Sequence, residues 1–231
     1  MKIAILLYDD FTTLDAVGPY EVLGRIPGAE VVFTAVRPGP VRNDQGSLAL
    51  VADAALSEVT APDLLLVPGG PGTEAVLTDP QVLDWVRRAD AATTWTTSVC
   101  SGSLLLGAAG LLAGRRATTH WVAHDTLARF GAVPTEERVV FDGKYATAAG
   151  VSAGIDLGLH LAGRIAGDAV AEAIQLITEY DPQPPYRAGS LATAPAEVVA
   201  AVRAAGVEVD PALIDPASPL AAARAGAGPR G

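Results

Sequence analysis

The chain has 231 residues, of which half are hydrophobic and 18% are charged, and this balance excludes wholesale disorder. Acidic residues outnumber basic ones by 26 to 16, giving a formal charge of −10, so we expect no nucleic-acid partner. The single cysteine excludes an intrachain disulfide, a Cys-rich zinc site and an iron–sulfur cluster. No signal-peptide core and no apolar stretch of membrane-spanning length is visible, which favours a cytoplasmic protein without membrane contact.

Short apolar runs rich in Ile, Val and Leu predict buried strands at Ile3–Tyr8, Val31–Val36, Leu64–Val67 and Thr94–Val99. Continuous runs of this length are typical of parallel strands that helices cover on both faces. Further along, Val139–Phe141 and Tyr145–Ala148 flank Asp142–Gly143, a dipeptide typical of a hairpin turn. The pattern predicts an α/β fold with a mostly parallel central sheet.

Helical patterns follow the predicted strands. Asp79 is a predicted cap and Pro80 a first-turn residue of a helix over Pro80–Ala92. The segment Ser101–Ala109 is small and apolar all round, which predicts a buried helix. Further helices are predicted at Asp15–Arg25, Ala123–Phe130, Ser152–Ala166, Ala169–Tyr180 and Ala196–Ala205. Strands that alternate with helices indicate βαβ units.

The compact part of the chain is predicted to end at Pro182–Pro185 (PQPP). We therefore expect one catalytic domain over residues 1–181 and a C-terminal extension over residues 182–231. That extension holds one possible helix and, from Asp215, a loose tail rich in Ala, Pro and Gly.

Cys100 is the first candidate for chemistry, because it stands between the apolar run TTWTTSV and the small-residue segment SGSLLLGAAGLL. This setting predicts a nucleophile elbow at the carboxyl end of the sheet, where open α/β folds bind ligands. Helix N-terminal amides at such an elbow stabilise an oxyanion and lower the pKa of a thiol. The alternative is a buried structural cysteine.

A glycine-rich loop, LLLVPGGPG at residues 64–72, follows another predicted strand. It lacks the Lys-Ser/Thr of a P-loop and the spacing of a dinucleotide fingerprint, so nucleotide binding is not predicted. Gly69 and Gly70 are expected to leave backbone N–H groups accessible as an oxyanion hole. Gly70 and Pro71 are therefore candidate oxyanion or substrate-binding residues, and the alternative is a plain strand-to-helix turn.

Asp15 lies just beyond the first strand, where a carboxyl group can act as a general acid or base. The alternative is a helix cap, with Thr13 as a rival cap. His120 is a candidate partner or substrate-binding residue for Cys100. His124 follows four residues later, but no third ligand stands at a diagnostic spacing, so no metal site is predicted.

Three segments carry a resemblance over about residues 1–180: KIAILLYDDFTTLDAVGPYEVL, DLLLVPGGPG and TTSVCSGSLLLGAAGLLAGRRATTHW. Together they resemble the DJ-1/PfpI superfamily, which has the class I glutamine-amidotransferase-like fold. The resemblance implies a flavodoxin-like three-layer sandwich with a nucleophile elbow. The Asp in LDAVGP, with ATAAGVSAGIDLGLHLAGRIAG and QLITEYDPQPPY, is most similar to the isonitrile (isocyanide) hydratase subgroup.

This resemblance implies that Cys100 is the nucleophile and Asp15 the acid/base carboxylate. Ser101 stands where the hydratases carry a Thr that hydrogen-bonds near the reacting centre. The implied reaction adds water to a small hydrophobic isocyanide and yields an N-substituted formamide through a thioimidate on Cys100. It needs no metal or organic cofactor, and the resemblance also implies a homodimer.

Other functions remain open. One is glyoxalase- or deglycase-like chemistry on small α-oxoaldehydes with the same cysteine; a His directly after the nucleophile is absent, since residue 101 is Ser. Another is a ligand-sensing module, although the Ala/Pro/Gly tail cannot encode the helix-turn-helix region of related transcription regulators. A third is a redox sensor that forms a sulfenic acid at Cys100.

Overall fold

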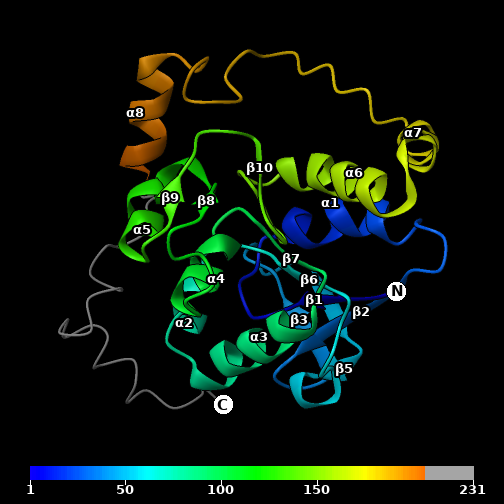
Figure 1. The fold of residues 1–231 in the computed structure, drawn as a ribbon. Coiled ribbons are helices and arrows are strands. Elements are labelled where there is room, and N and C mark those ends of the chain that lie inside the picture. Colours follow the sequence, from blue (N-terminus) through cyan, green and yellow to red (C-terminus); the bar gives the residue numbers. More distant parts are fainter. Residues whose placement is uncertain (206–231) are drawn as a thin grey trace.

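The predicted apolar runs form the centre of a seven-stranded sheet in the computed structural model, which describes residues 1–205 (Figure 1). The strand order is β10-β11-β7-β6-β1-β2-β5, and all neighbours are parallel except the β10–β11 hairpin. These strands are β1 (Lys2–Leu6), β2 (Glu30–Ala35), β5 (Ala54–Ala55), β6 (Leu64–Val67), β7 (Trp95–Val99), β10 (Val139–Asp142) and β11 (Tyr145–Ala148). The mostly parallel α/β fold is thereby confirmed.

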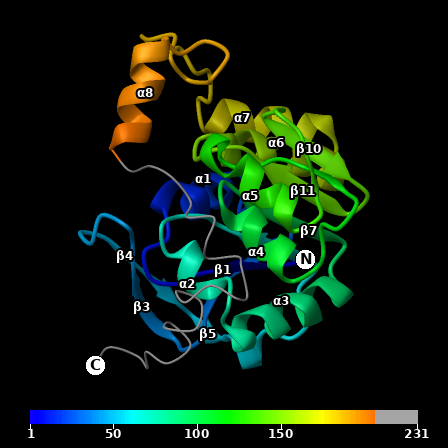
Figure 2. The ribbon, with the colours of Figure 1, turned by 90° about the vertical axis from the view of Figure 1, so that its left-hand side faces the viewer.

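Helices cover both faces of this sheet. One layer holds α1 (Thr13–Leu23), α6 (Ala153–Ala166) and α7 (Asp168–Ile177), and the other holds α2 (Thr73–Val76), α3 (Pro80–Ala92) and α4 (Gly102–Ala108). The two views in Figures 1 and 2 show the sheet between the layers, with α5 (His124–Arg129) beside α4. The arrangement is the expected three-layer sandwich.

Local signals in the sequence set several helix ends. Asp79 Oδ1 accepts hydrogen bonds from the backbone N–H of Gln81 at 2.8 Å and of Val82 at 3.4 Å, and Pro80 opens α3, as predicted. Gly167 separates α6 from α7 with a φ of 90°, a conformation that glycine adopts without steric cost.

Several short elements are absent from the sequence prediction. They are the hairpin of β3 (Gly39–Arg42) with β4 (Ala49–Ala52), the pair β8 (Arg116–Ala117) and β9 (Val133–Pro134), helix α2, and the 3₁₀ turns η1 (Leu56–Glu58) and η2 (Trp121–Ala123). Each has only two to four residues, so none repeats a hydrophobic period for long enough to be read.

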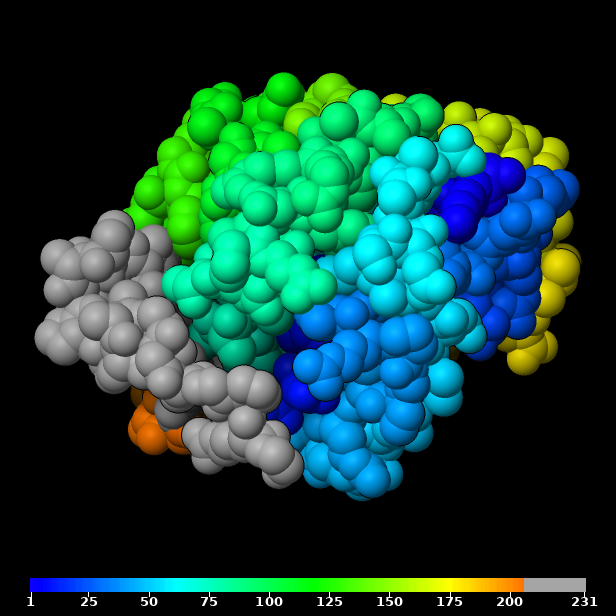
Figure 3. Space-filling model, turned by 90° about the horizontal axis from the view of Figure 1, so that it is seen from below, coloured from blue at the N-terminus to red at the C-terminus, as the bar shows by residue number. Residues whose placement is uncertain are grey.

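In Figure 3, the blue N-terminal segment reaches the lower surface between the light-blue β3–β4 hairpin and the teal α2–α3 segment.

The C-terminal extension contains the predicted helix, α8 (Ala196–Ala204). Figures 1 and 2 both show α8 standing away from the sheet, and none of its residues is buried. The predicted loose tail from Asp215 lies outside the described residues, and the boundary at residue 181 stays a prediction. Within residues 1–205, no helix is both long and apolar enough to cross a membrane.

Candidate active site

Cys100 forms the turn between β7 and α4, at the carboxyl end of the sheet. Its backbone has a φ of 57°, in the left-handed region that costs a non-glycine residue on the order of 1 to 3 kcal/mol. The surrounding backbone holds this conformation: the Cys100 N–H donates to the carbonyls of Ala148 and Ala149, each at 3.1 Å. Thr119 Oγ1 donates to the Cys100 carbonyl at 3.0 Å. The strained turn is the predicted elbow, and it fixes where the thiol points.

Two glycines allow the elbow to approach the neighbouring strand end. A Cβ at Gly102 would lie 2.1 Å from the carbonyl oxygen of Val67, the last residue of β6. A Cβ at Gly69 would lie 2.5 Å from the backbone nitrogen of Ser101. Glycine is therefore required at both positions for the start of α4 to pack against the loop after β6.

Asp15 lies in the first turn of α1 and is completely buried. Its Oδ2 accepts the backbone N–H of Gly69 at 2.9 Å. Its Oδ1 has no partner of ordinary hydrogen-bond geometry among the described residues, and the thiol of Cys100 acts on this carboxyl together with the Gly69 amide. The N-cap of α1 is Thr12, without a side-chain cap bond, so the alternative of a capping role for Asp15 or Thr13 is wrong.

Burial governs the protonation of the Cys100–Asp15 pair. It raises the pKa of Asp15 to about 7, against the opposing effects of the Gly69 amide and the Cys100 thiol. Burial and the nearby Asp15 charge raise the pKa of Cys100 well above its usual range, although the amides of Ser101 and Val151 oppose this. The expectation of a lowered thiol pKa at the elbow is therefore wrong, because desolvation outweighs the amides. At neutral pH the sulfur keeps its proton, and the carboxyl beside it is close to its own titration point.

The glycine-rich loop does not present free amides. The Gly69 N–H is taken by Asp15, and the Gly70 N–H donates to Ser101 Oγ at 3.0 Å. Accessible N–H groups at these glycines were expected from the sequence, and the structure shows them bonded because both side chains turn toward the loop. Pro71 follows as an exposed residue. Oxyanion or substrate binding by Gly70 and Pro71 stays a prediction.

His120 packs on Gly150. No hydrogen bond joins it to Cys100 in the part of the chain that the structure describes, and its ring packs so closely on Gly150 that a Cβ there would lie 2.6 Å from His120 Cδ2. Burial, together with the nearby His124, lowers the pKa of His120. Residues 1–205 contain no group of three or more His, Cys, Asp or Glu side chains that could hold a metal ion.

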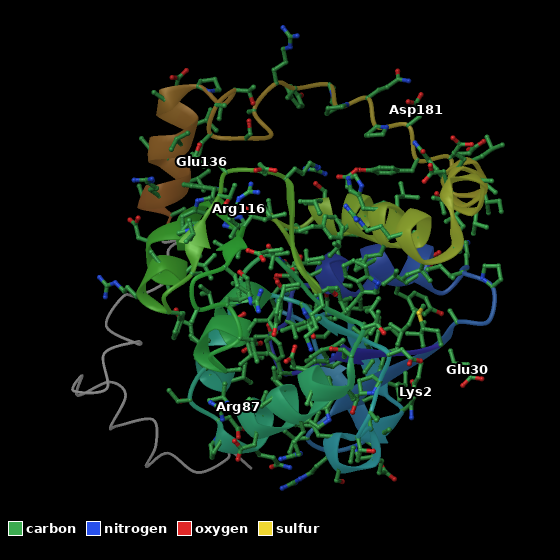
Figure 4. All side chains as sticks on the ribbon, in the orientation of Figure 1. Lys2, Glu30, Arg87, Arg116, Glu136 and Asp181 are labelled. Carbon is green, nitrogen blue, oxygen red and sulfur yellow. The ribbon has the colours of Figure 1, made fainter. Side chains whose placement is uncertain are left out.

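A cavity of about 790 Å³ opens beside the elbow, within the range of about 300 to 1,000 Å³ typical of small-molecule sites. Thr119 and Val151 line it and also contact the backbone or thiol of Cys100, whereas Cys100, Asp15 and Ser101 do not line it themselves. Its outer wall comes from the extension, at residues 189–192 and Arg203, whose guanidinium lies 5.6 Å from the Trp121 ring centroid. Glu136, labelled near α8 in Figure 4, is another wall residue.

Comparison with known proteins places this fold and site in a family. The model of the DJ-1/PfpI family matches residues 1–163. The chain belongs to the DJ-1/PfpI family.

Relatives within the DJ-1/PfpI family differ in their described activities. The chain is 43% identical to an isonitrile hydratase of Pseudomonas putida over 199 residues, covering 86% of this chain and 87% of the hydratase. It is 28% identical to a deglycase of Pyrococcus abyssi over 64% of this chain and 89% of that protein. The crystal structure of a ThiJ/PfpI family protein from Pseudomonas syringae superposes with a TM-score of 0.85 at 45% identity, covering 87% and 84% of the two chains.

Sequence reasoning missed two polar residues of this DJ-1/PfpI site. Tyr8 follows β1, and its buried hydroxyl donates to the Pro68 carbonyl at 2.6 Å. Thr73 opens α2, and its hydroxyl lies 2.9 Å from both Tyr8 Oη and Ser101 Oγ. The predicted apolar run Ile3–Tyr8 includes Tyr8, and Thr73 directly follows the predicted glycine-rich loop at residues 64–72. The signal that could have found Tyr8 is a polar atom at the end of a buried strand, where a partner is required.

Proposed function

We propose that this protein is an isonitrile hydratase, which converts an isocyanide and water into an N-substituted formamide. The observation that carries the proposal is the buried Cys100–Asp15 pair, in which a thiol lies beside a carboxyl whose pKa burial raises to about 7. The 43% identity to the Pseudomonas putida hydratase, over most of both chains, supports the same reaction.

The first step adds the thiol across the terminal carbon of R–N≡C. The Cys100 sulfur forms a bond to that carbon, Asp15 accepts the thiol proton, and the same proton passes to the carbon. The product is the thioimidate R–N=CH–S–Cys100, with no net change in protons. A carboxyl with a pKa of about 7 suits this task, because it both accepts and donates a proton at neutral pH.

In the second step, water adds to the C=N bond of the thioimidate. The water oxygen bonds to the carbon while Asp15 takes one proton from the water. Asp15 then passes this proton to the nitrogen, which gives R–NH–CH(OH)–S–Cys100. The C–S bond then breaks, and the sulfur regains its proton as R–NH–CHO leaves. Every atom of the product comes from the isocyanide and water, so the reaction needs no further co-substrate.

The cavity beside the elbow is the proposed place for the substituent R. Its wall includes Trp121, Val122 and Val151, which offer apolar surface to a hydrophobic group. His120 lies in the same wall, so we assign it to substrate binding and not to proton transfer with Cys100.

An isocyanide assay tests this proposal. Wild-type protein is expected to consume an alkyl or aryl isocyanide and to release the matching formamide, followed by NMR. Cys100→Ala is expected to abolish the reaction, whereas Asp9→Asn, which changes an exposed carboxyl near the site, should retain it. Absence of formamide with wild-type protein, across both alkyl and aryl substrates, would exclude hydratase activity.

Deglycase-like chemistry is the second candidate, favoured by the identity to the Pyrococcus abyssi deglycase. Turnover of methylglyoxal without isocyanide consumption would select it. A redox-sensing role is less well supported, because oxidation follows thiolate character and exposure, while Cys100 is buried with a raised pKa.

The homodimer and the cytoplasmic location expected from the sequence are carried forward as parts of the proposal. The exposed apolar side chains of Leu176 and Ile177 on α7 support a dimer, since both remain more than half exposed at 78% and 68%. Sedimentation of the purified protein measures the oligomeric state directly.

A further inference from the structure

A chain of hydrogen bonds links the strand ends around the active site. Tyr8 follows β1, the Pro68–Gly70 loop follows β6, and Ser101 follows β7, with Thr73 between them. The Thr73 hydroxyl lies between the other two, with its oxygen 2.9 Å from Tyr8 Oη and 2.9 Å from Ser101 Oγ. The residues that carry these hydroxyls are all buried. Three neighbouring parallel strands thus meet through a single polar chain.

The direction of each bond in this chain follows from its end. A carbonyl oxygen only accepts hydrogen bonds. Tyr8 therefore donates its single hydroxyl proton to the Pro68 carbonyl, at 2.6 Å. Thr73 must then donate to Tyr8. Ser101 must in turn donate to Thr73. The other acceptor within reach of Ser101, the Gly70 carbonyl, is more distant at 3.4 Å and is therefore the weaker partner.

The chain holds the loop after β6 at two points. Tyr8 binds the Pro68 carbonyl, and Ser101 Oγ accepts the Gly70 N–H at 3.0 Å. Gly69 lies between these two points, and its N–H is the donor to Asp15 Oδ2. The position of the amide that bonds the Asp15 carboxyl is therefore set by groups on either side of it.

We propose that Tyr8 and Thr73 are positioning residues, which hold Ser101 and the Gly69 amide in place and so tune the Cys100–Asp15 pair. They also commit the Ser101 proton to Thr73, so Ser101 does not donate to the substrate. This inference deepens the proposed function but rests on geometry independent of the substrate.

The Gly69 hydrogen bond lowers the pKa of Asp15, so loosening it moves that pKa upward. The Asp15 charge raises the pKa of Cys100, so a change in the protonation of Asp15 also changes the pKa of the thiol. A typical hydrogen bond corresponds to a shift of about half to one pKa unit. We expect Tyr8→Phe and Thr73→Val each to shift the pH profile of Cys100 reactivity by roughly that amount.

The test measures the rate of Cys100 alkylation by iodoacetamide from pH 5 to pH 10. Cys100 is the single cysteine, so the readout reports on one thiol and needs no isocyanide. Thr73→Ser keeps the hydroxyl and should restore the wild-type profile. Tyr20→Phe removes a hydroxyl from a part-exposed ring that packs on Phe33, and is the matched control without a shift.

Each outcome decides the inference. A shift in Tyr8→Phe and Thr73→Val, together with a double variant that shifts no further than either, supports one connected chain. Profiles that match Tyr20→Phe, or a Thr73→Ser profile equal to that of Thr73→Val, overturn it. If Tyr8→Phe fails to fold, the Thr73→Val and Thr73→Ser pair decides alone. Absence of isocyanide turnover would refute the proposed function and leave this test intact.

Discussion

The Cys100 site and the C-terminal extension are built in opposite ways. At the site, Asp15, Ser101 and Thr73 are buried, and each has a hydrogen-bond partner from a different strand end or helix. In the extension, residues 182–205 are almost all exposed, and α8 buries no residue. One contact between this extension and the preceding residues is the Arg203 guanidinium over the Trp121 ring.

The contrast predicts which substitutions change activity or stability most. Buried polar groups act in a medium of low effective dielectric, so the loss of one partner alters pKa values and packing together. Exposed side chains exchange protein contacts for water at little cost. We therefore expect effects to fall steeply from the site to the extension.

Asp15→Asn tests the site side with the largest expected effect. The amide cannot move the thiol proton to the substrate carbon, so kcat/KM for an isocyanide should fall by about 10² to 10⁴. Steady-state kinetics measures the loss, with Asp9→Asn as the control. Activity within about threefold of wild type would remove Asp15 from proton transfer and would weaken the contrast.

Gly102→Ala tests packing at the elbow. A Cβ 2.1 Å from the Val67 carbonyl forces the start of α4 away from β6, and overpacking of this kind costs about 1 to 3 kcal/mol of unfolding free energy. The matched change in the extension is Gly189→Ala, where a Cβ meets no atom within 4 Å. Urea denaturation should separate the two variants, and equal midpoints would contradict the close approach.

Acid–base linkage gives a third test. The folded-state pKa of Asp15, about 7, exceeds its ordinary value of 3.8. The folded protein therefore binds this proton more tightly than the unfolded chain does. This contribution to stability is fully present below about pH 4 and is lost as pH rises toward 7.

Wild-type unfolding free energy should therefore decline relative to Asp15→Asn over that interval, by on the order of 1 kcal/mol per unit of pKa difference. Urea denaturation at a series of pH values measures the difference. A constant difference between the two proteins would show that the carboxyl is not raised in pKa.

Val198→Ser gives the smallest expected effect. Val198 lies on α8 with 40% of its surface exposed, so its loss should change the unfolding free energy by no more than about 0.5 kcal/mol. The same denaturation assay measures it. A loss comparable to that of Gly102→Ala would show that the extension packs on another surface, such as a second copy of the chain.

Much of the fold follows from local sequence. The apolar runs at Leu64–Val67 and Thr94–Val99 correspond to β6 and β7, and Asp79 caps α3 as predicted. The short pair β8–β9 could not be predicted, because two residues carry no period and the strands pair across 17 positions of chain. The place of Cys100 at a strand-to-helix turn was also evident from its neighbours.

The protonation state of the site could not be read in the same way. The helix-terminus rule predicts a lowered thiol pKa, whereas Cys100 has a raised one. The rule counts the amides near the sulfur, but it does not count the water that the core removes. The prediction of accessible N–H groups in the glycine-rich loop was wrong for a related reason. The side chains of Asp15 and Ser101, which are remote from the loop in sequence, accept hydrogen bonds from its amides.

The sequence by itself determined the order of the longer strands and helices, the elbow around Cys100 and the family resemblance, because these depend on hydrophobic period and on neighbouring residues. Only the tertiary structure decided that Asp15 lies beside the thiol, that no hydrogen bond joins His120 to the thiol within residues 1–205, and that Tyr8 and Thr73 join the site. Those relations depend on which strand ends meet at one edge of the sheet. The single cysteine thus acquires its proposed chemistry from residues 15, 69 and 101, which folding brings together in a buried, low-dielectric environment.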